Sequence, residues 1–298
     1  MSDFFSAFGF GIVAAGVLAV AAVGLTLQFG VTNYINFAYG ELITFGAYAT
    51  YALNQQTLHL NLWIAWIVGG LATGLLAFLV QRFVFTPFVN RRPQLLFALI
   101  VTFVVSLMLN DLYGAVFGTD FHEMPGPLPA DSIHSIGPLL VEGNQIVYFA
   151  AAVLAMLAIQ LMLNFTPIGR SMRAMSDDMA LAKACGLNTT LITDVAWLVS
   201  GFLAGLAGVI IAMQTHTFGV DLGDTYLFLV FASVILGGIG RAYGAVAGAI
   251  VIGLGTQLSV LVVPSSVSLV AVFVVLVFIM VFRPEGFLGS VAHSKMER

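Results

Sequence analysis

The chain has 298 residues, of which 60% are hydrophobic and only 8% charged, and its mean hydropathy is +1.04. A soluble domain carries about 25% charged residues, so the composition excludes a soluble globular protein. Residues 4–40, 42–81 and 242–282 contain no Asp, Glu, Lys or Arg, and one membrane helix needs only about 20 apolar residues. These runs lack the alternation of barrel strands. We expect an all-α, polytopic transmembrane bundle in one domain, 1–298.

The beginning of the chain predicts a retained membrane span. The first ten residues contain no Lys or Arg, whereas a cleavable secretory signal begins with a basic region. The span is therefore placed at residues 9–29. Cys185 is the only cysteine, which excludes an internal disulfide and a metal site of several cysteines. We expect no metal, no cofactor and no nucleic-acid partner.

Basic residues order the spans, because cytoplasmic loops collect Lys and Arg. They form four groups: Arg82, Arg91 and Arg92; Arg170, Arg173 and Lys183; Arg241; and Arg283, Lys295 and Arg298. The intervening spans are predicted near 9–29, 34–53, 62–85, 95–117, 146–165, 191–213, 225–240, 244–262 and 267–283. This order predicts about eight or nine crossings, with the N-terminus outside and the C-terminus inside. The segment 225–240 is short for a crossing and is predicted to be a half-helix.

The longest outer segment is 119–143, which is predicted to be a periplasmic loop. It contains Pro125, Pro127, Pro129 and Pro138. Proline fixes its own φ and restrains the preceding residue, so this segment cannot be a continuous helix. We expect a surface structure and no second domain.

A carboxylate in the second predicted span points to a substrate path. Glu41 is the only acidic residue between Asp3 and Asp111, and charge at membrane depth usually faces a bundle interior or a water-filled path. The surrounding candidate residues are Asn33, Asn36, Tyr39, Gly40 and Thr44. This mixture of amides, a phenol and glycine predicts an interrupted helix near 33–41, which protein or a cavity must surround.

A second interruption is predicted near 237–244. Gly237, Gly238 and Gly240 are crowded and would destabilise a helix. The string GGIGRAYG superficially suggests a dinucleotide loop, but a membrane run lacks the strand and βαβ unit that such a loop needs. Two further pairs at i, i+4 are predicted to let helices approach closely: Gly244 with Gly248, and Gly201 with Gly205.

Paired interruptions are typical of transporters whose substrate site lies between broken helices. The exposed N–H and C=O groups of helix ends can bind a zwitterion without fixed side-chain charges. Glu41 has two interpretations, which are direct contact with substrate and an interhelical hydrogen bond that fixes the unwound backbone. Asn33 and Asn36 have the same two interpretations.

The segment 166–190 is predicted to be a cytoplasmic coupling loop. Met172, Met175, Met179 and Ala182 recur at helical spacing, whereas Arg170, Arg173, Asp177 and Lys183 lie on more polar faces. Ser176 or Asp177 is predicted to cap a short helix that ends at Gly186. Exposed methionines suit a partner's groove. The alternative is an interfacial helix that rests on lipid.

Absent motifs exclude several function classes. No Gly-Lys pair occurs, so the chain lacks the phosphate-binding loop GxxxxGK[ST] and cannot hydrolyse ATP by that route. No HExxH occurs, and the histidines fall in predicted loops or the tail. An ion-coupled secondary transporter would need more intramembrane carboxylates or histidines than Glu41. A membrane enzyme would need convergent catalytic groups.

Three blocks resemble permease subunits of branched-chain amino acid ABC importers. They are GLTLQFGVTNYINFAYGELITFGAY (24–48), PIGRSMRAMSDDMALAKACGLNTTLI (167–192) and FASVILGGIGRAYGAVAGAIVIGL (231–254). Together the resemblance covers nearly the whole chain. It implies a transport subunit without enzyme activity in the bacterial inner membrane, which imports branched-chain or similar small neutral amino acids. Related permeases carry urea, short amides or other organic solutes.

The resemblance also implies partners: a second permease subunit in a heterodimer, two ATPase subunits, a periplasmic solute-binding protein and the lipid bilayer. The ATPases would contact Arg170, Arg173, Asp177, Asp178, Lys183 and Gly186. Three positions depart from the family pattern. Tyr39 stands where relatives have His, Arg241 where they have a small residue, and Ala180 where the docking motif EAAxxxG has its acidic residue.

Overall fold

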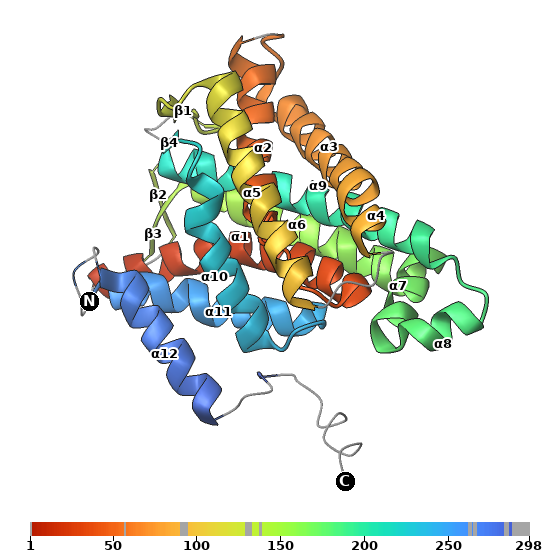
Figure 1. The fold of residues 1–298 in the computed structure, drawn as a ribbon. Helices are drawn as coiled ribbons and strands as arrows, with labels where there is room; N and C mark the ends of the chain where they lie inside the picture. Colours follow the sequence, from red (N-terminus) through yellow and green to blue (C-terminus); the bar gives the residue numbers. More distant parts are fainter. Residues whose placement is uncertain are drawn as a thin grey trace.

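The structure is a computed structural model that describes residues 2–56, 58–89, 95–128, 133–136, 139–261, 264, 267–282 and 286–287. Its helices are α1 (Ser2–Thr32), α2 (Tyr39–Tyr51), α3 (Leu62–Val80), α4 (Thr86–Val89), α5 (Leu95–Phe117), α6 (Gly143–Phe165), α7 (Pro167–Asp177), α8 (Met179–Ala184), α9 (Thr189–Thr215), α10 (Leu222–Gly237), α11 (Ala242–Ser259) and α12 (Ser268–Phe282). The π-helical turns η1 (Ala52–Gln56) and η2 (Gln81–Phe85) extend α2 and α3. Figure 1 shows the resulting helical bundle.

Each of the nine predicted spans contains a helix, and α5 has the predicted bounds. Within the described residues, six helical segments are long and apolar enough to cross a membrane: Ser6–Thr32, Leu62–Phe88, Leu96–Phe117, Gly143–Phe165, Thr189–Thr215 and Ala242–Ser259. The difference from eight or nine crossings lies in α2, α10 and α12, which have 13, 16 and 15 residues. Several residues used for the sequence predictions lie outside the described residues: Arg91, Arg92, Pro129, Pro138, Arg283, Lys295 and Arg298.

Two long helices form the centre of the bundle. α1 packs against α6, α9, α10 and α11, whereas α9 packs against α1, α2 and α3. The chain has no proline before Pro87, so no proline interrupts the hydrogen bonds of α1 or α3. Glycines allow close contact at the centre, because a Cβ on Gly46 would overlap Gly205 and a Cβ on Gly208 would overlap Ile43.

The two predicted packing pairs are confirmed. A Cβ on Gly201 would overlap Ala77 of α3, and a Cβ on Gly248 would overlap the Ser233 carbonyl of α10. Gly205 and Gly244 lie equally close to neighbouring helices. Small residues at such crossings let backbones approach, which is how helices associate in a membrane.

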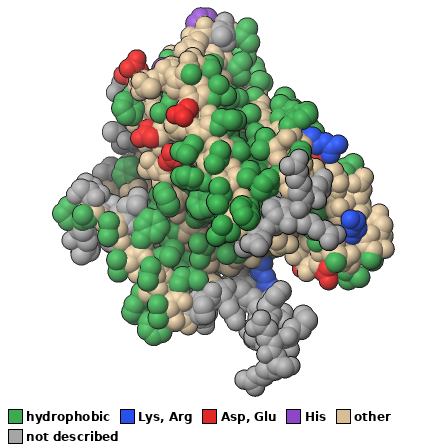
Figure 2. All heavy atoms as spheres, viewed as in Figure 1, with side chains coloured by type: hydrophobic (Ala, Val, Ile, Leu, Met, Phe, Trp, Pro, Cys, Tyr) green, Lys and Arg blue, Asp and Glu red, His purple; other side chains and the backbone are tan. Residues whose placement is uncertain are grey.

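The outer helices expose apolar rows. On α3 the exposed residues Ile64, Ile67, Leu71 and Leu75 follow helical spacing, and α5, α6 and α12 carry similar rows. Figure 2 shows large groups of hydrophobic side chains spread over the visible face. Exposed apolar surfaces that extend along several helices are rare on soluble monomers and are suited to contact with lipid.

The ends of the bundle differ in structure and charge. One end, which we call the strand end, carries β1 (His122–Glu123) paired with β4 (Thr217–Phe218), and β2 (Ile133–Ile136) paired with β3 (Leu139–Glu142). The expected non-helical character of 119–143 is confirmed for its described part, although two- and four-residue strands were not predicted because they leave no periodic pattern. The strand end carries Asp120, Glu123, Asp221 and Asp224.

The other end carries α7 and α8, and we call it the α7–α8 end. Every Lys or Arg in the described part of the chain lies there: Arg82, Arg170, Arg173, Lys183 and Arg241. Arg82 pairs with Asp194 at 3.4 Å. Figure 2 shows the blue and red side chains largely separated in this way.

Candidate translocation site

The first predicted interruption is present between α1 and α2. α1 ends at Thr32, Asn33 has a left-handed φ of 56°, and α2 begins at Tyr39. The Asn33 amide still donates to the Phe29 carbonyl at 2.8 Å, so the turn closes the last turn of α1. Asn tolerates this left-handed conformation better than most residues, which explains its position at the break.

Asn36 fixes the two sides of this break to each other. Its Nδ2 donates to Gln28 Oε1 of α1 at 2.9 Å, and its Oδ1 accepts from the Ala38 amide at 3.0 Å. The side chain is 1% exposed. The bond to Ala38 satisfies an N–H group at the start of α2 that has no partner within the helix. The geometry therefore supports the structural interpretation of Asn36.

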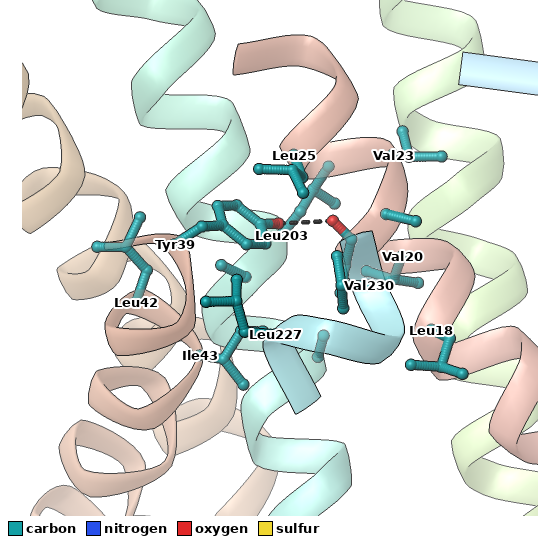
Figure 3. Packing of buried hydrophobic residues seen from close by; sticks show 14 of the residues in the cluster. Leu18, Val20, Val23, Leu25, Tyr39, Leu42, Ile43, Leu203, Leu227 and Val230 are labelled. Carbon is teal, nitrogen blue, oxygen red and sulfur yellow. Dashed lines mark hydrogen bonds between the residues drawn. The ribbon is translucent and has the colours of Figure 1, made fainter. Parts of the chain in front are cut away.

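Tyr39 points into the core. Its hydroxyl donates to the Ala21 carbonyl of α1 at 2.7 Å, and its side chain is fully buried. Figure 3 shows the ring between Leu25, Leu203 and Ile43, with the hydrogen bond crossing to α1. The phenol thus joins α2 to α1 and lines neither of the two cavities described below.

Glu41 is buried where α2, α5 and α10 meet. Ser106 Oγ of α5 donates to Glu41 Oε1 at 3.3 Å, and the Tyr113 hydroxyl donates to the Glu41 backbone carbonyl at 3.2 Å. Asn110 and Asp224 flank the same carboxyl group. Glu41 Oε2 is buried and makes no hydrogen bond with the described residues. Glu41 is thus an interhelical contact whose carboxyl faces a second acidic group.

The N-terminal turns of α2 and α10 touch beside Glu41. A Cβ on Gly223 would overlap the Gly40 carbonyl oxygen, and the Gly223 amide donates to Thr44 Oγ1 at 2.8 Å. Glu41 and Asp224 each follow one of these glycines and lie in the first turn of their helices. Carboxylates are favourable at that position because helix N-termini carry partial positive charge.

The second interruption is also present. α10 ends at Gly237, and α11 begins at Ala242. Gly238 and Gly240 have φ values of 101° and 86°, which few residues other than glycine adopt. Gly237 has a different role, because a Cβ there would overlap the Gly244 carbonyl. Gly237 is therefore a packing contact between α10 and α11 as well as the last residue before the break.

α10 separates Gly40 and Glu41 from Gly237. Gly223, beside Gly40 and Glu41, lies at its start, and Gly237 lies at its end. At about 1.5 Å per residue these glycines are about 21 Å apart. Glu41 lines neither of the two cavities described below, whereas the smaller of them joins the first break, through Ile35 and Phe37, to Ile239 of the second break. The sequence pattern marks two breaks but not their separation.

A cavity of about 530 Å³ lies beside the second break. Its walls come from α1, α6, α7, α11 and the turn before α11. Three of the predicted residues line it: Arg173, Asp177 and Gly240. A second, smaller cavity is apolar and lies between Ile35 and Phe37 of the first break and the C-terminal half of α10.

The methionine face of 166–190 does not point toward a partner. Met172 and Met175 are 3% and 1% exposed and pack into the core of this chain, while Met179 is 37% exposed. The prediction of an exposed methionine face is therefore wrong for α7. Helical spacing shows which residues share a face but not which way that face points.

The coupling segment contains two helices instead of one. α7 ends at Asp177, and Asp178 Oδ1 accepts from the Leu181 amide at 2.9 Å to cap α8. The cap is therefore Asp178, and the prediction of Ser176 or Asp177 is corrected. Gly186, with φ of 82°, follows the end of α8 as predicted. The predicted coupling residues are exposed in this structure: Arg170, Arg173, Asp177, Asp178, Lys183 and Gly186.

Sequence reasoning missed the partners of Glu41. Ser106, Asn110 and Tyr113 come from one face of α5, and Asp224 comes from α10. One local signal was available, because the pairs Gly40-Glu41 and Gly223-Asp224 repeat the same glycine–acid order at the start of a short helix. Nothing in the sequence placed the two pairs together.

Long apolar helices, lipid-suited outer faces and paired breaks define a multi-pass membrane protein with the architecture of a permease. The family model described as the branched-chain amino acid transport system permease component matches residues 8–282. The chain belongs to this family, and the resemblance of its three sequence blocks is confirmed.

Individual relatives cover nearly the whole chain. The high-affinity branched-chain amino acid transport system permease protein BraD of Pseudomonas aeruginosa is 24% identical over 289 residues, which is 94% of each chain. The corresponding protein LivH of Escherichia coli is 24% identical and covers 94% of this chain and 93% of its own. The ribose import permease RbsC of Haemophilus influenzae is 26% identical over 92% of this chain and 83% of its own. No solved structure matches.

Proposed function

We propose that the chain is one of two membrane subunits of an ABC importer for branched-chain or similar small neutral amino acids in the bacterial inner membrane. The observation that carries this proposal is the family match over residues 8–282. BraD and LivH support the substrate class, because both are named for it and both align over almost their full length.

The charge distribution supports the proposed orientation. Lys and Arg of the described residues gather at the α7–α8 end, and cytoplasmic loops collect these residues. We place this end in the cytoplasm and the strand end in the periplasm. The periplasmic binding protein would then deliver substrate to the strand end, beside Glu41 and Asp224.

α8 offers the proposed contact for the ATPase subunits. Leu181 is 61% exposed and Met179 is 37% exposed, while Ala182 anchors the helix against the protein. Exposed apolar residues on a short helix are suited to a partner's groove. Arg170, Lys183 and Gly186 flank this surface. The alternative, in which α8 rests on lipid, predicts that its apolar residues affect membrane contact but not ATPase binding.

α10 is the proposed moving element of the pathway. It is too short to span the membrane, the second interruption follows it, the first lies against its C-terminal half, and its ends hold Gly223 and Gly237. The Gly223–Thr44 hydrogen bond holds its start, and the glycine turn at Gly238 and Gly240 allows its other end to shift against α11. Within this mechanism Glu41 fixes the start of α10, and direct contact between Glu41 and substrate is the less supported interpretation.

Ribose, or another small organic solute, is the second candidate substrate. It is favoured by one observation, which is the alignment with RbsC over most of this chain. Periplasmic binding proteins carry much of the selectivity in this class by the family resemblance, so the binding protein decides between the candidates. Urea is a further candidate substrate, and binding to the periplasmic protein decides between it and the others.

Co-purification and ligand binding test the proposal. The tagged chain is expressed with the neighbouring reading frames, and two ATPase subunits and a second permease subunit should elute with it. Calorimetry on the associated binding protein should show binding of leucine and valine, with ribose and urea as competitors. Elution of the chain without ATPases, or binding of ribose or urea alone, would contradict the proposed function.

A further inference from the structure

The cavity at the α7–α8 end combines an apolar interior with charged groups. Val23, Leu27, Ile159 and Val246 line part of its wall, and Arg173, Asp177 and Arg241 line another part. Ligand sites in proteins are typically apolar clefts of about 300–1,000 Å³ with a few converging polar groups. The volume of about 530 Å³ lies within that range.

Polar side chains reach this cavity from separate helices. Gln160 and Asn164 of α6 are four residues apart and share one helix face. Arg173 and Asp177 of α7 have the same spacing. The outward face of α6 is apolar, with exposed Leu154, Leu157 and Leu161 among its residues. In this C-terminal part of α6 the polar residues Gln160 and Asn164 line the cavity, while Leu154, Leu157 and Leu161 face outward.

Hydrogen bonds connect three walls of the cavity. Arg173 Nη1 of α7 donates to Asn164 Oδ1 of α6 at 3.3 Å, and Asn164 Nδ2 donates to the Tyr243 hydroxyl of α11 at 3.3 Å. These two hydrogen bonds orient the Arg173 side chain in the absence of a ligand. Preorganised polar groups reduce the entropy that binding costs.

One buried hydroxyl in the cavity wall has no partner among the described residues. Thr26 Oγ1 belongs to a side chain that is 2% exposed, and it makes no hydrogen bond to the described protein. Buried hydroxyl groups are usually hydrogen-bonded to protein or to another molecule. Its position in the wall is independent of the charged groups on α7 and in the turn, and it indicates a polar occupant.

The charges favour a zwitterion over an anionic lipid. Arg173 and Arg241 suit a carboxylate, whereas Asp177 suits an ammonium group. Basic pockets between membrane helices can also bind anionic headgroups. A phospholipid, however, would leave Asp177 beside its phosphate and would place its chains against Gln160.

We propose that this cavity binds a zwitterionic amino acid with an apolar side chain from the α7–α8 side of the membrane. Arg241 and Arg173 hold the carboxylate, Asp177 holds the ammonium group, and the side chain lies against Val23, Leu27 and Ile159. The inference rests on the proposed function and extends it with a binding site inside this subunit. It also gives Arg241, which departs from the family pattern, a specific role.

Equilibrium binding tests the site. The purified complex of this chain with its partner subunits, without ATP and without the binding protein, is titrated with radiolabelled leucine. Wild type should bind leucine saturably, and Arg241→Gln and Asp177→Asn should each weaken binding at least tenfold. Arg241→Lys should retain most of the affinity because it preserves the charge. Arg82→Gln is the matched control, since Arg82 pairs with Asp194 outside the cavity, and it should bind like wild type.

A labelling experiment on the wild-type complex does not depend on whether the variants fold. Photoleucine, a diazirine analogue of leucine, is irradiated with the wild-type complex, and the modified peptides are identified by mass spectrometry. Labels within 156–163 of α6 or 23–31 of α1, suppressed by excess leucine, are expected. Labels confined to other segments would overturn the proposal, as would a copurifying anionic phospholipid that excludes leucine from the site.

Failure of the site can be separated from failure of the proposed function. If the reconstituted importer accumulates leucine but leucine binding is the same in wild type, Arg241→Gln and Asp177→Asn, the cavity proposal alone is overturned. If the complex neither transports nor binds leucine, both proposals are contradicted.

Discussion

The amide of Gly223 donates a 2.8 Å hydrogen bond to the hydroxyl of Thr44, and this bond joins the first turns of α10 and α2. Beside it, the backbones of Gly40 and Gly223 are so close that neither position has room for a Cβ without displacement. The next residues, Glu41 and Asp224, place a carboxyl at each helix start. This crossing fixes the start of the short helix α10.

Gly223→Ala should destabilise the α2–α10 crossing. The added methyl would overlap the Gly40 carbonyl, which is backbone and cannot rotate away, and overpacking typically costs about 1–3 kcal/mol. A lower melting temperature in detergent is expected. Gly114→Ala is the control, because its Cβ would lie 3.7 Å from the nearest atom, a methyl carbon of Thr119. Equal melting temperatures for both variants would contradict the close crossing.

Glu41→Gln should preserve assembly and most transport, whereas Glu41→Ala should lower both. Gln keeps the shape, accepts the hydrogen bond from Ser106 and offers an amide donor toward Asp224. Ala leaves the Ser106 hydroxyl without its acceptor and opens a cavity, and lost buried hydrogen bonds cost about 1–3 kcal/mol. Melting temperature and initial uptake rate are the readouts. Abolished uptake in a well-assembled Glu41→Gln variant would instead assign Glu41 a charge-dependent role.

Met175→Ala and Met179→Ala should differ strongly. Met175 is 1% exposed and Met179 is 37% exposed. Truncating a buried methionine costs about 2–5 kcal/mol, while the exposed position should change stability little. Thermal unfolding of the two variants measures the difference. A similar loss for both would mean that α7 and α8 pack differently from this structure.

Leu181→Asp should weaken ATPase binding without unfolding the permease. Leu181 is 61% exposed on α8, so the charge meets solvent when the subunit is alone but would be buried in the proposed contact with the ATPase. Reduced co-purification of the ATPase with an unchanged melting temperature is expected. Leu128→Asp serves as the control, since Leu128 is 39% exposed at the strand end. Normal ATPase recovery with Leu181→Asp would remove α8 from the proposed interface.

Local sequence signals predicted the helices and the breaks well. Continuous apolar runs placed a helix in each of the nine predicted spans, and Asn33, Gly238 and Gly240 marked the positions where the backbone takes a left-handed φ. Such features depend on the residue itself and its neighbours. The short length of α10 was also visible from the sequence.

Long-range contacts were not predictable in the same way. The meeting of Gly40 with Gly223 joins residues far apart in the chain, and no local pattern specifies such a partner. The buried face of α7 shows the same limit, because Met172 and Met175 have helical spacing whether they face solvent or the core. Tertiary packing decides the direction of a face, and periodicity only defines its members.

ATP-dependent uptake tests the central claim most directly. The complex of this chain with its second permease and ATPase subunits is reconstituted into proteoliposomes, with the binding protein and radiolabelled leucine on the side of the strand end and ATP on the side of α7 and α8. We predict accumulation of leucine that requires ATP, the binding protein and this chain. Accumulation driven by an ion gradient without ATP, or transport of ribose or urea but not leucine or valine, would contradict the account.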